Sequence, residues 1–509
     1  MIAPPARSRV APALVAAPIA SLAFVGILVL TTVAVRDGLL GNDVLRLWEG
    51  AATAADGEVP FGRVVAAYPT LPFLATTLVA WAFPGGTPAP ALVAALLFGI
   101  VAAVCFLSFR KARFPLPIAA AFTVLIVFHP ALLRAVIAGP GDMFLAAFVL
   151  MLSLALYDLR LRSGTAEVMH VGLALMGLAF SHPIGAALAF AAMPFLAFAL
   201  RPRLVANSAL NVVVALVFPT LFAIGAFSYV SWVFPGDGWT FFAAPAESLS
   251  VWAVGLARAF GDTLFDLPAL DASLAMAAAL AIGAPLVPAM LLLVRRRRPL
   301  VAPALVLTAA AIAATALCVI TGIFGDPAAI VIVAPMLAAA MTSRVPAARE
   351  HIPLTAVLLI AGWFGGLGSV ALADPITVNR LQFALAHGDG GRADALAAGG
   401  VAAADNGVLV DIDNMPAFLL GRGAAPGILG PQSEAFTLAM LFRRVETPFV
   451  AVPDPQSQAG ANDRLDRAFP ALFHDGPPGY RLVYQNNTWR IFERQNNSQR
   501  TRINNCKLQ

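Results

Sequence analysis

Polar side chains that could do chemistry lie where long apolar stretches of this chain end. Asp37 and Asp43 follow the first apolar run, and Asp142 begins a later one. A carboxylate at the start of a helix also suits the helix dipole, so each aspartate could be a solvated cap. His182 can be neutral or charged near neutral pH and could hydrogen-bond a phosphate, or could only cap a helix end. Arg134 precedes Asp142 by about two helical turns and could reach the same surface, or serve as an interfacial anchor.

The elements that position these residues are membrane-spanning helices. The chain is 60% hydrophobic and 12% charged, against about 25% charged residues in soluble proteins. The net charge of +5 does not indicate nucleic-acid binding, because the basic residues stand at the ends of apolar runs. The three cysteines lie far apart and form neither a disulfide framework nor a metal spacing. We therefore predict a polytopic α-helical membrane protein with about 11–13 transmembrane helices.

Five clusters of arginine predict the orientation of these helices. They end apolar stretches at residues 110–113, 160–162, 201–203, 295–298 and 344–349. Positive residues of short loops stay in the cytoplasm, so the opposite tips are expected to face the periplasm of a bacterial inner membrane. The N-terminal run that ends near residue 35 is too long for a signal-peptide core, and we interpret it as an uncleaved first span.

The stretch 70–84 decides how the crossings are counted. If the N-terminus and the 110–113 cluster are both cytoplasmic, the chain must cross the membrane an even number of times between them. The sequence offers three candidate spans there. Residues 70–83 are few for a span and lead into Pro84-Gly85-Gly86. A re-entrant or interfacial helix is the preferred interpretation, and a first span with its N-terminus outside is the alternative.

Residues 1–373 are predicted to form the transmembrane domain, with outer loops at 36–69 and 234–270. Within the first loop, apolar residues recur at helical spacing over 43–55, which predicts an amphipathic helix on the membrane surface. Residues 374–494 are predicted to form a small periplasmic α/β domain. Its strand-like runs lie at 407–413 and 447–452, and a hairpin is expected over 480–492. Residues 495–509 are polar and expected to be disordered.

The order of several short motifs resembles the GT-C superfamily of integral-membrane glycosyltransferases. The first loop carries Asn42-Asp43-Val44-Leu45, an amphipathic segment ending near glycine, and then Tyr68-Pro69-Thr70-Leu71-Pro72. Further along stand His129-Pro130-Ala131-Leu132-Leu133-Arg134, Gly139-Pro140-Gly141-Asp142 and Ser181-His182-Pro183. The resemblance covers residues 20–200, and beyond them it extends only to a general plan of more spans and an outer tail.

The resemblance implies a chemistry for these residues. Asp43, with Asp37 beside it, would be the base that deprotonates an acceptor hydroxyl. The acceptor oxygen would then displace a polyprenyl phosphate from a sugar with inversion, onto a lipid, glycan or protein. A divalent cation, Mg or Mn, could bind at Asp43 and Asp142, or Asp142 could instead help to bind and orient the acceptor substrate. The donor phosphate would be held by that metal or by basic side chains, namely Arg36, Arg63, Arg134 and His182.

One departure from the family pattern leaves alternatives open. Many relatives carry a basic residue at an outer tip between two late spans, but the tip at residues 322–327 contains Asp326 and no basic residue. A non-catalytic subunit or assembly factor of a membrane complex is therefore the second hypothesis. A transporter is the third, and it is less favoured because the chain shows no internal repeat and no ionisable residue clearly at mid-span.

Overall fold

The structure is a computed structural model of the 509-residue chain. It describes residues 12–36, 42–55, 57, 59, 61–83, 88–162, 164–200, 202–234, 236, 238, 268–293, 301–344, 352–374, 390–402, 407–411, 417–422, 427–431, 433–457, 460 and 463–495. The chain divides into two compact units. The first comprises Met1–Thr31, Val65–Pro72 and Val93–Gln382, and the second comprises Thr32–Val64, Phe73–Leu92 and Phe383–Gln509.

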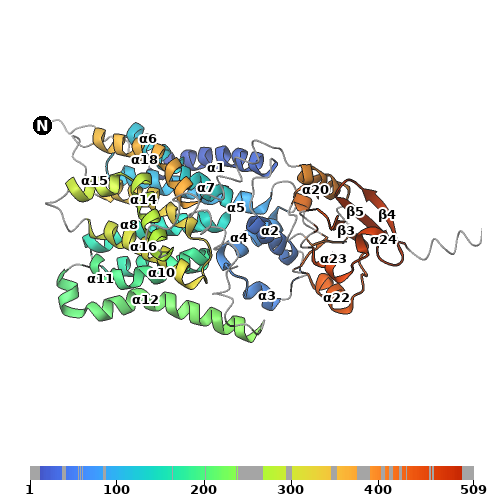
Figure 1. Cartoon of the computed structure of the whole chain (residues 1–509). Helices are drawn as coiled ribbons and strands as arrows, with labels where there is room; N and C mark the ends of the chain where they lie inside the picture. The colour runs from blue at the N-terminus through green and yellow to red at the C-terminus, as the bar shows by residue number, and fades with distance from the viewer. Residues whose placement is uncertain are drawn as a thin grey trace, which may run out of the picture. The chain divides into compact units, whose positions relative to one another are not determined.

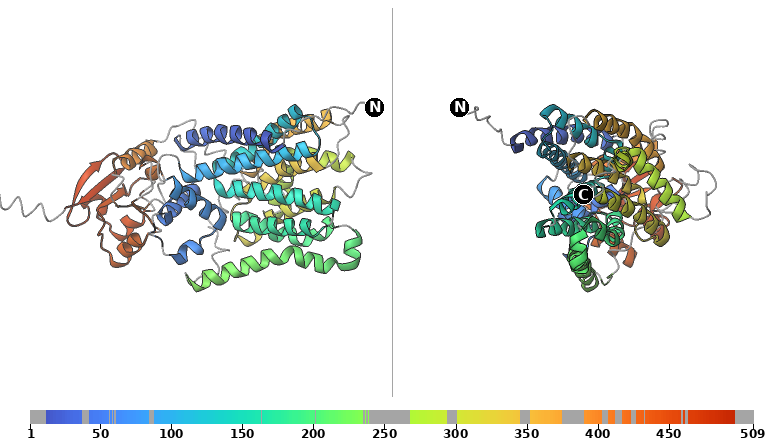
Figure 2. Two further views of the ribbon diagram at one scale, coloured as in Figure 1. Left: turned by 180° about the vertical axis from the view of Figure 1, so that it is seen from behind. Right: turned by 90° about the vertical axis from the view of Figure 1, so that its left-hand side faces the viewer.

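The first unit is a bundle of helices, which lie side by side in Figures 1 and 2. Its long helices are α1 (Pro12–Arg36), α5 (Ala89–Lys111), α8 (Pro140–Arg162), α9 (Thr165–Ser181), α12 (Pro202–Val233), α14 (Pro268–Gly283), α16 (Ala302–Thr321) and α18 (Ile352–Ala373). Shorter helices are α6 (Leu116–Val127), α7 (Pro130–Ala138), α10 (Pro183–Ala192), α11 (Leu196–Ala199), α15 (Leu286–Leu293), the 3₁₀ helix η4 (Pro327–Ile332) and α17 (Val333–Arg344). The closest neighbours include α8 with α9 and α17, α14 with α16 and α18, and α7 with α8 and α18.

The apolar helices make this a polytopic helical membrane protein, as the sequence predicts. Within the described part of the chain, seven helices are long and apolar enough to span a bilayer, or eight if a bent pair is one span. Four shorter apolar helices accompany them, and the predicted total of 11–13 requires some of these to cross as well. Helix α4 (Thr70–Ala82) has 13 residues, about 20 Å of helix, which is shorter than the hydrocarbon core. Its length agrees with the re-entrant interpretation.

The apolar segment over residues 115–137 is broken into two helices. Helices α6 and α7 meet at an angle of 55°, and His129 between them caps α7 by accepting a hydrogen bond from the Ala131 amide. Pro130 is the first residue of α7, where its missing N–H is not needed. Apolar periodicity alone could not reveal this bend, because apolar residues predominate in both arms.

Glycines let two helices of this unit approach closely. A Cβ atom on Gly365 of α18 would lie 2.2 Å from the Ile282 carbonyl oxygen of α14, and one on Gly362 would lie 2.9 Å from the Gly283 carbonyl oxygen. In a membrane, apolar burial does not drive helix association, so such close backbone packing provides much of the attraction.

Two arginine clusters meet at one end of the bundle. Arg344, the last residue of α17, pairs with Asp158 near the end of α8 through Nη2 and Oδ2 at 2.9 Å. Arg160 on the same helix end donates to the Leu200 carbonyl oxygen, just before the 201–203 cluster. These contacts confirm that the helix ends at residues 160, 200 and 344 share one side of the bundle.

The second unit contains a five-stranded mixed sheet. Its strands are β1 (Val408–Leu409), β2 (Ile428–Leu429), β3 (Phe449–Pro453), β4 (Tyr480–Gln485) and β5 (Trp489–Arg494), in the order β2-β1-β3-β5-β4. Strand β1 is parallel to β2 and β3, while β5 is antiparallel to β3 and β4. Helices α20 (Gly390–Val401), α21 (Ala417–Arg422), α22 (Glu434–Phe442), α23 (Arg464–Ala468) and α24 (Leu472–Asp475) complete the fold. The expected α/β character and the hairpin are both present.

The first outer loop belongs to the same core as this sheet. Helix α2 (Asn42–Ala55) is amphipathic as predicted, but its buried residues Val44, Trp48 and Ala52 pack in one cluster with Phe418 and Trp489. The apolar face of α2 is therefore covered by protein, which corrects the expectation that it lies on the membrane surface. Loop and tail share a core, so they lie on the same side of the membrane.

Candidate functional site

The joint between α7 and α8 places two charged residues at one end of the bundle. Gly139 has a φ of 104°, which favours glycine, and separates α7 from Pro140 at the start of α8. Asp142 lies in the first turn of α8, where free backbone amides favour a carboxylate. Arg134 projects from α7 to the same place, as the spacing of the two residues suggested.

Arg134 holds two buried carboxylates. Its Nη1 donates to Oδ2 of Asp142, and its Nε donates to Oδ2 of Asp374 at 2.7 Å. The side chains of Asp142 and Asp374 are only 5% and 3% exposed, against 13% for Arg134. A buried carboxylate is strongly unfavourable unless it is paired, so this guanidinium fixes α8 and the end of α18 to α7.

His182 completes the partners of Asp142. It is the residue between α9 and α10, and its Nδ1 accepts a hydrogen bond from the Ile184 amide at 3.0 Å. Its Nε2 faces Oδ1 of Asp142 at 3.3 Å. Gly141 permits this approach, because a Cβ atom there would lie 3.1 Å from Cδ2 of His182. Each oxygen of Asp142 therefore has a nitrogen partner. At 26% exposed, His182 is the most accessible of these side chains.

Asp326 lies close enough to this cluster for the charges of Asp374, Arg134 and Asp142 to affect the pKa of its carboxyl. It caps η4 through a 2.8 Å hydrogen bond from the Ala328 amide to Oδ1. Burial, together with the negative charge of Asp374, raises the pKa of the Asp326 carboxyl to about 7, whereas the hydrogen bond from the Ala328 amide and the charge of Arg134 oppose the shift. The acidic tip noted in the sequence is thus part of the electrostatics of the site.

A third motif reaches the same turn of the chain. The hydroxyl of Tyr68 donates to the Ala179 carbonyl oxygen at 3.0 Å, near the end of α9. Its ring also lies 6.0 Å from that of Phe227 on α12, and the ring of Phe180 contacts Phe227 as well. The Tyr68-Pro69 motif therefore packs against the segment that leads into Ser181-His182-Pro183.

The structure brings together three of the predicted site residues, namely Asp142, Arg134 and His182. Asp37 and the side chains of Arg36, Asp43 and Arg63 lie outside the described residues, so their predicted roles stay predictions. The sequence analysis missed Asp374 as a partner of Arg134. The available signal was its position directly after the apolar run that ends α18.

The predicted divalent cation stays a prediction, because the side chain of Asp43, one of its two predicted ligands, lies outside the described residues. None of them form a group of three or more metal-binding His, Cys, Asp or Glu side chains. Both oxygens of Asp142 face nitrogen atoms, from Arg134 and His182, and a metal would have to displace one of them. We therefore assign no metal to this cluster.

Comparison of the chain with known protein families finds no match. A comparison with curated proteins finds no significantly similar protein.

Proposed function

We propose that this chain is a membrane glycosyltransferase that transfers a sugar from a polyprenyl-phosphate donor to an acceptor on the periplasmic side of a bacterial inner membrane. The observation that carries the proposal is the convergence of three motifs that stand far apart in the sequence. Asp142 contacts both Arg134 and His182, and Tyr68 bonds the turn that precedes His182. These are the motifs on which the resemblance to the GT-C superfamily rests.

The proposed reaction assigns each group one task. Asp43 takes the proton of the acceptor hydroxyl, the acceptor oxygen attacks the anomeric carbon, and the bond from that carbon to the phosphate oxygen breaks with inversion. The leaving phosphate gains negative charge, which a nearby hydrogen-bond donor stabilises. His182 is suited to face the substrate because it is the most exposed member of the cluster. Asp142 and Arg134 hold it in place.

The direct test is sugar transfer by the purified protein in proteoliposomes. Polyprenyl phosphates with radiolabelled hexoses or pentoses serve as donors, and lipid, glycan and peptide fractions are counted as acceptors. We expect Asp43→Asn to lose transfer by about 1,000-fold, since a general base supplies about that factor. Asp475→Asn, which changes an exposed aspartate of the second unit, is the control and should transfer normally. Undiminished transfer by Asp43→Asn would exclude Asp43 as the base.

A non-catalytic membrane subunit is the second candidate function. Two carboxylates already compensate the guanidinium of Arg134, and the tip at residues 322–327 adds Asp326 without a basic residue. This balance of charge favours a structural role for the cluster over the binding of a phosphate. A stable stoichiometric partner in mild detergent, together with no transfer from any donor, would favour this candidate.

A further inference from the structure

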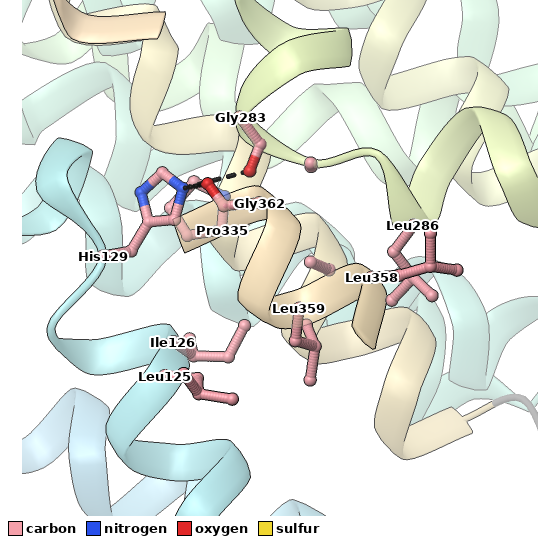
Figure 3. A pocket seen from close by; sticks show the side chains of 11 residues that line it. Leu125, Ile126, His129, Gly283, Leu286, Pro335, Leu358, Leu359 and Gly362 are labelled. Atoms are coloured by element: carbon pink, nitrogen blue, oxygen red, sulfur yellow. Dashed lines mark hydrogen bonds between the residues drawn. The ribbon is translucent and has the colours of Figure 1, made fainter. Parts of the chain in front are cut away.

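A histidine inside the bundle, His129, uses both of its ring nitrogens. Nδ1 accepts the Ala131 amide at 3.2 Å. Nε2 lies 3.0 Å from the Gly283 carbonyl oxygen and 3.1 Å from that of Gly362, as Figure 3 shows. An amide donor requires a lone pair on Nδ1, and the two carbonyls require a proton on Nε2. The hydrogen bonds therefore define one neutral tautomer.

The backbone around the ring needs this donor. Helix α14 ends at Gly283, and the amide of Val287, which would continue the helix to Gly283, instead donates to the Ala284 carbonyl at 2.9 Å. The Gly283 carbonyl oxygen thus depends on His129 for a partner. A carbonyl without a donor in an apolar interior is costly, so the contact holds the end of α14 to the start of α7.

Helix α18 contacts the same break from its other side. The indole Nε1 of Trp363 donates to the Phe128 carbonyl oxygen at 2.7 Å, while the Leu132 amide, which could have bonded Phe128, goes to the His129 carbonyl. Gly366 leaves room for the ring, because a Cβ atom there would lie 2.7 Å from Cε1 of His129. The end of α6 and the start of α7 are therefore both attached to α18.

The pocket beside the ring offers little that could replace these contacts. The pocket has a volume of about 10 Å³ that a water molecule can enter, and its other walls include Leu125, Ile126 and Leu359 (Figure 3). About one water could fit. A side chain that cannot donate at this place would leave the Gly283 carbonyl oxygen facing an apolar wall.

We propose that His129 is a positioning residue that fixes Arg134 in the polar cluster by pinning the start of α7 to α14 and α18. Arg134 lies about one and a half helical turns beyond His129 on α7, and it holds Asp374 at the end of α18. Helices α7 and α18 are thus joined at two levels, once by the imidazole of His129 and once by the guanidinium of Arg134. A displacement at the imidazole contact therefore also displaces the guanidinium contact. The consequence for catalysis rests on the proposed function, whereas the mechanical role does not.

Hydrogen–deuterium exchange of the intact protein in nanodiscs tests the mechanical role. His129→Leu can neither cap α7 nor donate, and we expect peptides covering 130–138 to exchange at least about tenfold faster. His129→Asn keeps an acceptor and a donor and should recover most of the protection. Thr123→Val is the matched control, since this buried threonine on α6 bonds only within its own helix, to Ala119, and should leave α7 unchanged. Wild-type exchange in His129→Leu would overturn the proposal.

Nitrogen-15 NMR of the labelled histidine rings gives a second readout that does not depend on the survival of the Leu variant. The resonance that disappears in His129→Asn should show a protonated Nε2 and an unprotonated Nδ1. A ring protonated at Nδ1 would overturn the assignment.

Sugar transfer separates this inference from the proposed function. We expect His129→Leu to lower kcat about 100-fold, with a smaller change in KM and rescue by His129→Asn. If the wild-type protein transfers no sugar but the exchange and NMR results hold, the proposed function fails and the positioning role stands. If transfer is real and His129→Leu matches the wild type in kcat and in exchange, the positioning role fails alone.

Discussion

Arg134 on α7 and Asp374 at the end of α18 form a buried ion pair across 240 residues of sequence, with Nε and Oδ2 2.7 Å apart. The same guanidinium also holds Asp142. One side chain thereby fixes the ends of α7, α8 and α18 relative to one another. That relationship generates the first prediction.

Removing the guanidinium of Arg134 should destabilise the protein, and removing one of its partners as well should restore part of the lost stability. Arg134→Met leaves two buried carboxylates without a cation, and we expect a loss of about 3–5 kcal/mol in the free energy of unfolding. Adding Asp374→Asn to Arg134→Met should recover part of that loss, because one uncompensated charge disappears. Thermal unfolding in detergent measures both variants. A loss in Arg134→Met below about 0.5 kcal/mol would contradict a buried pair, since exposed pairs are worth that little.

Substitutions at the two ends of α8 give a matched pair of variants for testing sugar transfer. Asp142 and Asp158 lie on one helix, and each pairs with an arginine from another helix. We expect Asp142→Asn to lower sugar transfer about 100-fold by releasing His182, because small misplacements in a site have effects of that size. Asp158→Asn should leave transfer within about twofold while also losing an ion pair. Equal losses in both variants would indicate a general effect on folding.

Two glycines of α18 should respond differently to an added methyl group. A Cβ atom on Gly366 would lie 2.7 Å from His129 and 2.8 Å from Pro130, whereas one on Gly368 meets nothing closer than 4.0 Å. Gly366→Ala should therefore cost about 1–3 kcal/mol of stability through overpacking. Gly368→Ala should be neutral or slightly stabilising, since alanine favours helix. Melting temperatures of the two variants give the comparison, and equal values would argue against the tight contact at His129.

The C-terminal domain should lose stability as the pH rises toward neutral. Burial, together with the charges of Asp411 and Asp466, raises the pKa of the Asp463 carboxyl from 3.8 to about 7, although amide hydrogen bonds oppose the shift. A raised pKa means that the folded state binds the proton more tightly. Its stabilising contribution is complete below about pH 4 and is lost as the pH rises through about 7.

Hydrogen–deuterium exchange of peptides covering 463–475 in the intact protein, from pH 4 to 8 after correction for intrinsic rates, measures this change. We expect a decrease on the order of 2–4 kcal/mol in the wild type. Asp463→Asn should abolish most of it, because asparagine can still cap α23 but carries no proton to lose. A pH dependence that persists in Asp463→Asn would assign the effect to another group.

Part of the candidate site could be predicted from local patterns. Asp142 and His182 each stand where an apolar run meets a helix-breaking Gly or Pro, and Arg134 precedes Asp142 by about two helical turns, so their place at one end of the bundle followed from the sequence. The bend at His129 and the role of Asp374 did not. Both depend on which helix packs against α7, and apolar periodicity is the same for any neighbour in a membrane.

The sequence by itself determined the membrane class, the common side of the arginine-rich helix ends and the α/β character of the tail, because composition and local spacing decide these. Only the tertiary structure decided that α2 packs with the C-terminal sheet, that Arg134 serves two aspartates and that His129 joins three helices. Except for Arg134 with Asp142, such contacts join residues far apart in the sequence, for example 154 residues for His129 with Gly283 and 240 for Arg134 with Asp374. No local pattern encodes which distant surface will be there.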